Sequence, residues 1–106
     1  MAISLDEQQP LDASIGYRVL AHLRADEESA TLSVGVDEEG GISIQLISDA
    51  RSIIMTDDDL EVAIVELVNA HERVNTGLSG ARYSFSKKAD GHWTMVGQFS
   101  YELSGK

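Results

Sequence analysis

One stretch of the chain, residues 56–77, limits the possible folds more than any other. Apolar residues, with one histidine among them, recur there at the three- and four-residue spacing of an amphipathic helix: Leu60, Ala63, Ile64, Leu67, Val68, His71 and Val74. Thr56 is the expected N-cap, because three carboxylates follow it where the helix dipole is positive. Gly77 is the expected C′ residue. The sequence therefore predicts a helix with one apolar face.

The segment before this helix alternates apolar and polar residues in two runs, as half-buried strands do. The apolar positions are Leu32, Val34 and Val36 in the first run and Ile42, Ile44 and Leu46 in the second. Residues 37–41 separate the runs and end in two glycines, which take positive φ at little cost. The pattern predicts an antiparallel hairpin. Residues 52–55 are a candidate for a third short strand.

The segment after the helix shows a second hairpin pattern. Tyr83 and Phe85 alternate with polar residues, and the dipeptide Asp90-Gly91 is a strong turn signal. One face of the final run collects Trp93, Met95, Gly97, Phe99 and Tyr101. We expect these residues on the core side of the sheet.

The N-terminal part fits two patterns. Its apolar residues recur at helical spacing and, over part of the same stretch, alternate as in a strand. Acids at 26–28 count against a helix, whereas length and the N-cap candidates Asp12 and Ser14 favour one. We expect residues 14–25 to form a helix, with a strand as the alternative, after a flexible arm over residues 1–11.

These elements predict one α+β domain over residues 12–106. The expected order is helix, two or three strands, helix, two strands, and short turns make the paired strands antiparallel. The predicted architecture is an antiparallel sheet of four to five strands with two helices packed on one face. The length of 106 residues suits a single domain.

Charge is the most unusual bulk property. The net charge is −10, and 16 of the 18 acids lie in residues 1–72. Such a field repels phosphate backbones, so direct nucleic-acid binding is not expected, and it attracts a basic protein. Solubility alone is an equally open explanation. The chain has no cysteine, no signal-like start and no apolar run of membrane length, so we expect a cytoplasmic protein.

Patterns for catalysis or for binding of a metal or cofactor are weak. His71-Glu72 lacks the second histidine of a zinc-protease helix, and His71 falls on the apolar stripe. Residues 57–59 lack the alternating ligands and the glycine bend of a calcium loop. Gly40-Gly41 precedes a strand rather than the helix that a phosphate loop needs. We therefore expect no enzyme activity, no metal and no cofactor.

Three acidic clusters remain as candidates for partner binding. The first two flank the strand at 32–36 and are expected at its opposite ends. Whether the third cluster shares a face with either is open. The candidate residues are Asp26, Glu27, Glu28, Asp37, Glu38, Glu39, Asp57, Asp58 and Asp59.

The element order and several residues resemble the YezG-like immunity proteins of bacterial polymorphic toxin systems. The similar parts are Ile15-Gly16, the strand at 32–36, the acidic start of the middle helix, Trp93-Thr94 and residues 97–102. The resemblance implies one α+β domain that binds and blocks a toxin catalytic domain, often a nuclease. An acidic inhibitor suits a nuclease, because nucleases attract phosphate and are therefore basic.

The leading hypothesis is thus an immunity-type inhibitor, monomeric or a small homo-oligomer, that binds a basic protein. One alternative is a homodimeric secretion chaperone for an exported effector. Another is an enzyme or a small-ligand-binding domain that uses His22, His71 or His92 with a carboxylate.

Overall fold

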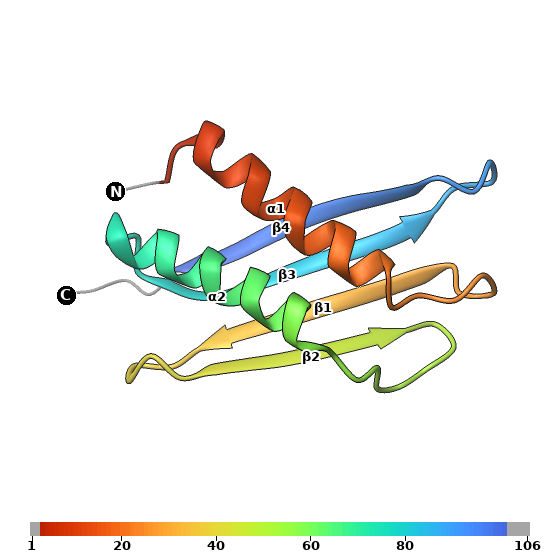
Figure 1. Cartoon of the computed structure of the whole chain (residues 1–106), viewed down its shortest axis with the longest axis horizontal. Coiled ribbons are helices and arrows are strands. Elements are labelled where there is room, and N and C mark those ends of the chain that lie inside the picture. Colours follow the sequence, from red (N-terminus) through yellow and green to blue (C-terminus); the bar gives the residue numbers. More distant parts are fainter. Residues whose placement is uncertain (1–2, 102–106) are drawn as a thin grey trace.

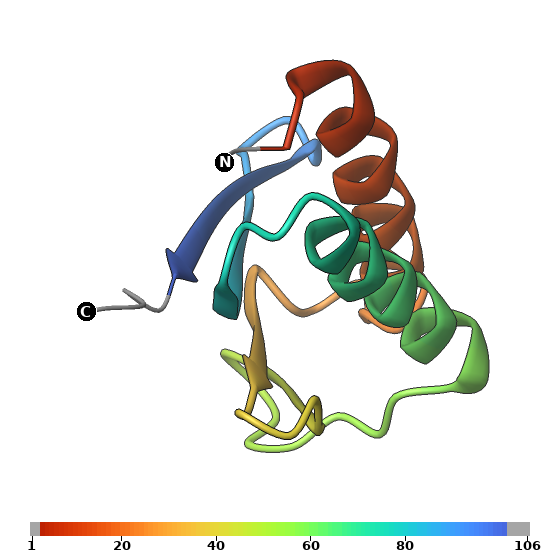
Figure 2. The same cartoon turned by 90° about the vertical axis from the view of Figure 1, so that its left-hand side faces the viewer.

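Two helices lie side by side on one face of a four-stranded antiparallel sheet in the computed structural model, which describes residues 3–101 (Figure 1, Figure 2). The strands lie in the order β2-β1-β3-β4, so β2 and β4 form the edges. This confirms the predicted α+β class. The elements are α1 (Leu5–Leu20), β1 (Ser29–Val36), β2 (Ile42–Ser48), α2 (Asp58–Arg73), β3 (Leu78–Lys87) and β4 (Trp93–Tyr101).

Helix α1 begins well before the expected position. Its N-cap is Ser4, whose Oγ accepts a hydrogen bond from the Glu7 N–H at 3.2 Å. Neither Asp12 nor Ser14 is the cap. Residues 5–11 are helical, Pro10 included, so the prediction of a flexible arm is wrong for them. Residues 1–2 lie outside the described part of the chain.

The first half of α1 was not predicted because the side of the helix that faces the core is polar there. Gln8 is buried, and its amide donates a hydrogen bond to Asp12 Oδ1 at 2.6 Å. Two polar residues at core positions interrupt the apolar periodicity by which a helix is recognised. Residues 14–20 are helical as predicted, and the strand alternative is wrong, but the helix ends at Leu20 rather than at residue 25.

The segment from β2 to α2 contains no strand. Residues 52–55 run beside β2, and the Ile54 N–H donates to the Leu46 carbonyl at 2.8 Å without forming a ladder. The optional fifth strand is therefore absent from the described residues. Asp57, rather than Thr56, caps α2, because its side chain accepts a hydrogen bond from a backbone N–H of the first turn at 2.9 Å.

Asn75 ends helix α2 in the role that was expected for Gly77. Asn75 has φ 56°, the left-handed conformation of a C′ residue. Its N–H bonds the Glu72 carbonyl, and the Thr76 N–H bonds the His71 carbonyl, both at 3.1 Å. These two bonds form a Schellman motif and satisfy carbonyls at the helix end.

The core lies between the helices and the inner face of the sheet. Alternate residues of β1 and β3 point inward, and the register pairs Leu32 with Leu46 on one side and with Tyr83 on the other. Trp93, Met95 and Phe99 pack against this core as predicted, whereas Tyr101 is exposed. The largest buried apolar side chains are Tyr83, Phe85, Ile15, Leu32, Leu46, Leu60, Ile64 and Leu67.

Candidate functional site

The nine candidate carboxylates lie at two opposite ends of the sheet. Residues 26–28 and 57–59 share the end where β1 begins, which we call the Arg51 end. At this end, helix α1 contacts the cluster at 57–59: Arg18 pairs with Asp59 at 3.6 Å. Residues 37–39 form the β1–β2 turn at the other end, called the Asp37 end (Figure 1). The expected placement of the first two clusters at opposite ends of β1 is confirmed.

Glu27 does not belong to a binding surface. Its side chain is fully buried, and its carboxylate accepts hydrogen bonds from Arg51 Nε and Nη2, each at 2.6 Å. The Ser48 hydroxyl and the Arg24 N–H also donate to it. These bonds, with Arg51 first, lower the pKa of Glu27 from 4.5 to about 2. The carboxylate therefore fixes the α1–β1 connection to the β2–α2 connection.

Two further candidate carboxylates stabilise their own backbone. Asp37 Oδ1 accepts hydrogen bonds from the Glu39 and Gly41 N–H groups at 2.9 and 2.6 Å, which closes the β1–β2 turn. Asp57 is the N-cap of α2, and that bond is the main cause of its lowered pKa. The other six candidates, Asp26, Glu28, Glu38, Glu39, Asp58 and Asp59, are exposed.

Two hollows lie between α2 and the β1–β2 hairpin, one toward each end of the sheet. Glu61, Val65, Val68 and Glu72 recur at helical spacing and form one stripe along the β2 side of α2. Opposite them, Ile42 and Ile44 point to the helix side of the sheet but remain half-buried, because α2 does not fully cover them. We call this feature, with the hollows at its two ends, the α2–β2 groove.

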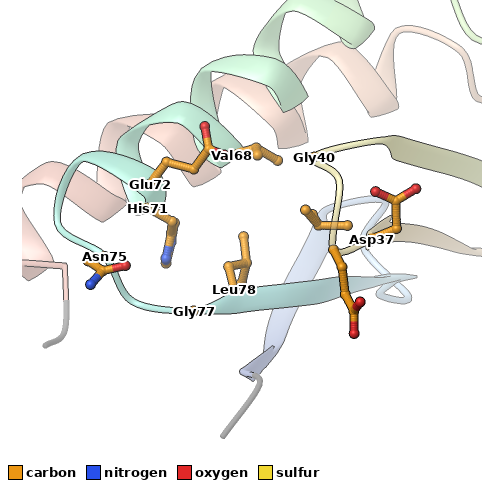
Figure 3. A pocket seen from close by; sticks show the side chains of 10 residues that line it. Asp37, Gly40, Val68, His71, Glu72, Asn75, Gly77 and Leu78 are labelled. Carbon is orange, nitrogen blue, oxygen red and sulfur yellow. The ribbon is translucent and has the colours of Figure 1, made fainter. Parts of the chain in front are cut away.

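The hollow at the Asp37 end has a volume of about 330 Å³. Figure 3 shows Val68, His71 and Glu72 on its α2 side and Asp37 and Gly40 on the facing β1–β2 turn. The C-terminal end of α2, where the helix dipole is negative, borders the hollow. Its charged lining residues are all acidic: Asp37, Glu38 and Glu72.

The hollow at the Arg51 end has a volume of about 430 Å³ and a more apolar lining. Its walls include Ile44 from β2 and Glu61 from α2. Ile53 and Met55 also line it and are 67% and 82% exposed, values that are high for apolar side chains. Among residues 3–101, Glu61 is the one charged residue of this lining, so both ends of the groove are acidic.

The backbone of β2 adds hydrogen-bonding groups to the groove. The Leu46 carbonyl accepts the bond from Ile54, so it points away from β1. Alternate residues of a strand direct their N–H and C=O groups to the same side, so Ile42 and Ile44 also present theirs at the edge. Among residues 3–101, no strand pairs with this edge. An unpaired edge is a template for another strand.

His71 is a hydrogen-bonded residue at the edge of the core, as its place on the apolar stripe indicated, but its partners in this buried polar network were not predicted. The Gln8 amide nitrogen is committed to Asp12, so its oxygen faces His71 Nε2 at 2.9 Å. His71 therefore donates from Nε2 and accepts at Nδ1 from the Thr76 hydroxyl at 2.9 Å. Burial lowers the pKa of His71, which favours this neutral form. Both ring nitrogens are occupied, and the side chain joins α1 to α2.

The other two histidines do not converge with His71; His22 is half-buried and His92 is exposed. His22 Nε2 is 3.3 Å from Asp57 Oδ1 without hydrogen-bond alignment, and His92 Nδ1 contacts Asp90 at 2.9 Å within its own turn. Within residues 3–101, no three His, Asp or Glu side chains are placed to hold a metal ion. Neither described helix has the length and apolarity of a membrane span.

Comparison with known proteins leaves the chain without an assigned family. No protein-family model matches it, and no curated protein matches it. The resemblance to YezG-like immunity proteins therefore remains a prediction.

Val68 is buried, as its place on the apolar stripe predicted, and it also lines the hollow at the Asp37 end. Glu61 and Glu72, which line the two hollows, were not among the predicted site residues. The available signal was the acidic-apolar-apolar-acidic spacing from Glu61 to Glu72, next to a core stripe that is already complete. That signal could not show that β2, rather than solvent, lies opposite the stripe.

Proposed function

We propose that this protein is a binding domain that recognises a basic protein through the α2–β2 groove and inhibits it in the manner of an immunity protein. The observation that supports this proposal is the charge of the groove. Within the described part of the chain, every charged residue that lines either hollow is acidic. Apolar residues and a strand edge that pairs with no described strand lie between the two ends. This combination favours lysine and arginine beside aliphatic groups.

A basic partner is also consistent with the whole molecule. With a net charge of −10, the protein attracts a basic domain from a distance and repels nucleic acid. A nuclease must carry basic residues where it binds phosphate. An acidic domain docked on such a surface would block access of the substrate, which is the inhibitory activity that we propose.

The proposal is tested by affinity capture from the native host with tagged protein. We expect recovery of one basic protein at about 0.1 M salt and weaker recovery at about 1 M, where the Debye length falls from about 10 to about 3 Å. The captured protein is then assayed for nuclease and other catalytic activity with and without this chain. Addition of the chain should abolish that activity.

Two double variants locate the interface. Glu38→Lys with Glu72→Lys changes the groove, and Asp26→Lys with Glu28→Lys changes the Arg51 end by the same net charge. All four side chains are exposed, so both variants should fold. We expect only the first variant to lose the partner. A neutral or acidic partner, or equal loss with both variants, would contradict the proposal.

A further inference from the structure

We propose that the α2–β2 groove accepts an extended segment of the partner, which adds to β2 as a fifth, antiparallel strand. This inference rests on the proposed function and specifies how the partner is recognised. The exposed N–H and C=O groups of Ile42 and Ile44 are its docking points, because they point away from β1 and pair with no described strand. Every other strand pair in the sheet is antiparallel.

The geometry of the groove determines which type of side chain fits at the middle of the bound segment. In an antiparallel pair, the residues opposite Ile42 and Ile44 point to the same face, which is the face toward α2. They would meet Val65 and the half-buried isoleucines, so an aliphatic side chain fits the middle. Val65 is 41% exposed in the free protein, and a bound strand would cover it.

The two acidic ends of the groove favour basic residues at two positions of the bound segment. Glu61 and Glu72 are eleven residues apart on α2, a separation of about 16 Å. The first and fifth residues of a strand are about 14 Å apart and share one face. Lysine or arginine at those two positions can therefore reach the two glutamates. The expected recognition sequence is basic-x-aliphatic-x-basic.

Charge also identifies the occupant as a different protein rather than a second copy of this chain. Pairing of two β2 edges would bring together two molecules of net charge −10 and place acidic groove ends near each other. Like charges at an interface oppose association. A basic segment meets no such penalty.

The probe is the acetylated, amidated heptapeptide Gly-Lys-Thr-Val-Thr-Lys-Gly, titrated into the ¹⁵N-labelled protein and followed by NMR. We expect shift changes at Ile42, Ile44, Leu46 and Val65, and none along β4. Two further peptides carry one N-methyl group each, on valine or on the first threonine, and have the same charge. N-methylvaline should weaken binding about tenfold, because its N–H faces β2, whereas N-methylthreonine should bind as the parent does.

Side-chain variants provide a second, matched comparison. Glu61→Gln with Glu72→Gln should weaken peptide binding, and Asp26→Asn with Glu28→Gln at the Arg51 end should not. Equal effects of the two N-methyl groups, shift changes confined to other surfaces, or no binding would overturn the strand addition. A homodimer with protected Ile42 and Ile44 amides would also overturn it. If a basic partner is still captured in any of these cases, the proposed function stands and only this inference fails.

Discussion

At the scale of single residues, Asp12 links two parts of the protein. Its Oδ1 accepts hydrogen bonds from the Gln8 amide and the Tyr83 hydroxyl, each at 2.6 Å. Burial, and then the bond to Asp12, raise the pKa of Tyr83 well above its usual value, so the phenol remains a donor. Through Gln8 the same network reaches His71. Polar groups thus connect α1 with α2 and β3 in a small core.

This network predicts an unequal effect of two matched substitutions. Tyr83→Phe removes a buried donor to a carboxylate and should lower the free energy of unfolding by about 1.5–3 kcal/mol. Tyr17→Phe is the control, because Tyr17 is 71% exposed on the same helix that carries Asp12, and it should change stability by less than about 0.5 kcal/mol. Urea denaturation measures both. Similar values for the two variants would contradict the structural role of the bond.

The Glu27–Arg51 pair predicts a specific dependence of stability on pH. The pKa of Glu27 is about 2 in the folded protein and 4.5 in the unfolded chain. The unfolded carboxylate therefore takes up a proton first as the pH falls. The stability that the ionised pair contributes is complete above pH 4.5 and is lost progressively as the pH falls toward 2.

Glu27→Gln isolates this effect. The variant should be less stable than the wild type at about pH 7, and the difference between their urea midpoints should narrow at about pH 3. Acid also protonates other carboxylates, but these are shared by both proteins. A difference that stays constant over this range would show that the ion pair does not set the pKa of Glu27.

At the scale of elements, the end of α2 depends on one left-handed residue. Asn75 has φ 56°, which costs little for glycine and more for residues with a Cβ atom. Asn75→Gly should raise stability by up to about 1 kcal/mol. Asn69→Gly, an exposed position inside the same helix, should lower it by about 0.3–0.5 kcal/mol. Thermal unfolding distinguishes the opposite signs, and a loss in both variants would contradict the assigned C′ role.

Regular patterning made most elements predictable. The two hairpins and α2 follow periods of two and 3.6 residues, and the structure contains all of them. Strand β3 begins at Leu78, in a segment expected to be a loop, and its pairing with β4 is irregular between Leu78 and Gly80. The first half of α1 failed because Gln8 and Asp12 occupy inward positions. Their partners, His71 and Tyr83, lie more than 60 residues away in the chain, and periodicity does not detect contacts at that separation.

The candidate site was less predictable than the fold. Acid-rich turns were visible in the sequence, but it could not show that Glu27 folds inward onto Arg51. The α2–β2 groove exists because β2 is the edge strand beside α2. That position follows from the pairing of β1 with β3 across the intervening helix, which no local pattern encodes.

At the scale of the whole molecule, the two ends of the sheet differ in whether their acidic side chains are paired with arginines. Arg51 and Arg18 pair with acids at the Arg51 end, so part of the charge there is neutralised. The hollow at the Asp37 end is lined by Asp37, Glu38 and Glu72, and no lysine or arginine among residues 3–101 lines it. We therefore expect the proposed partner to bind along the α2–β2 groove and toward the Asp37 end.

Amide hydrogen exchange of the protein, alone and bound to the captured basic partner, tests this placement most directly. Outward-facing amides of Ile42, Ile44 and Leu46 should exchange more slowly in the complex, because a bound strand would occupy the edge. Amides along the other edge strand, β4, should be unchanged. Protection along β4 or around residues 26–28, with no change in β2, would contradict the claim that the α2–β2 groove binds the partner.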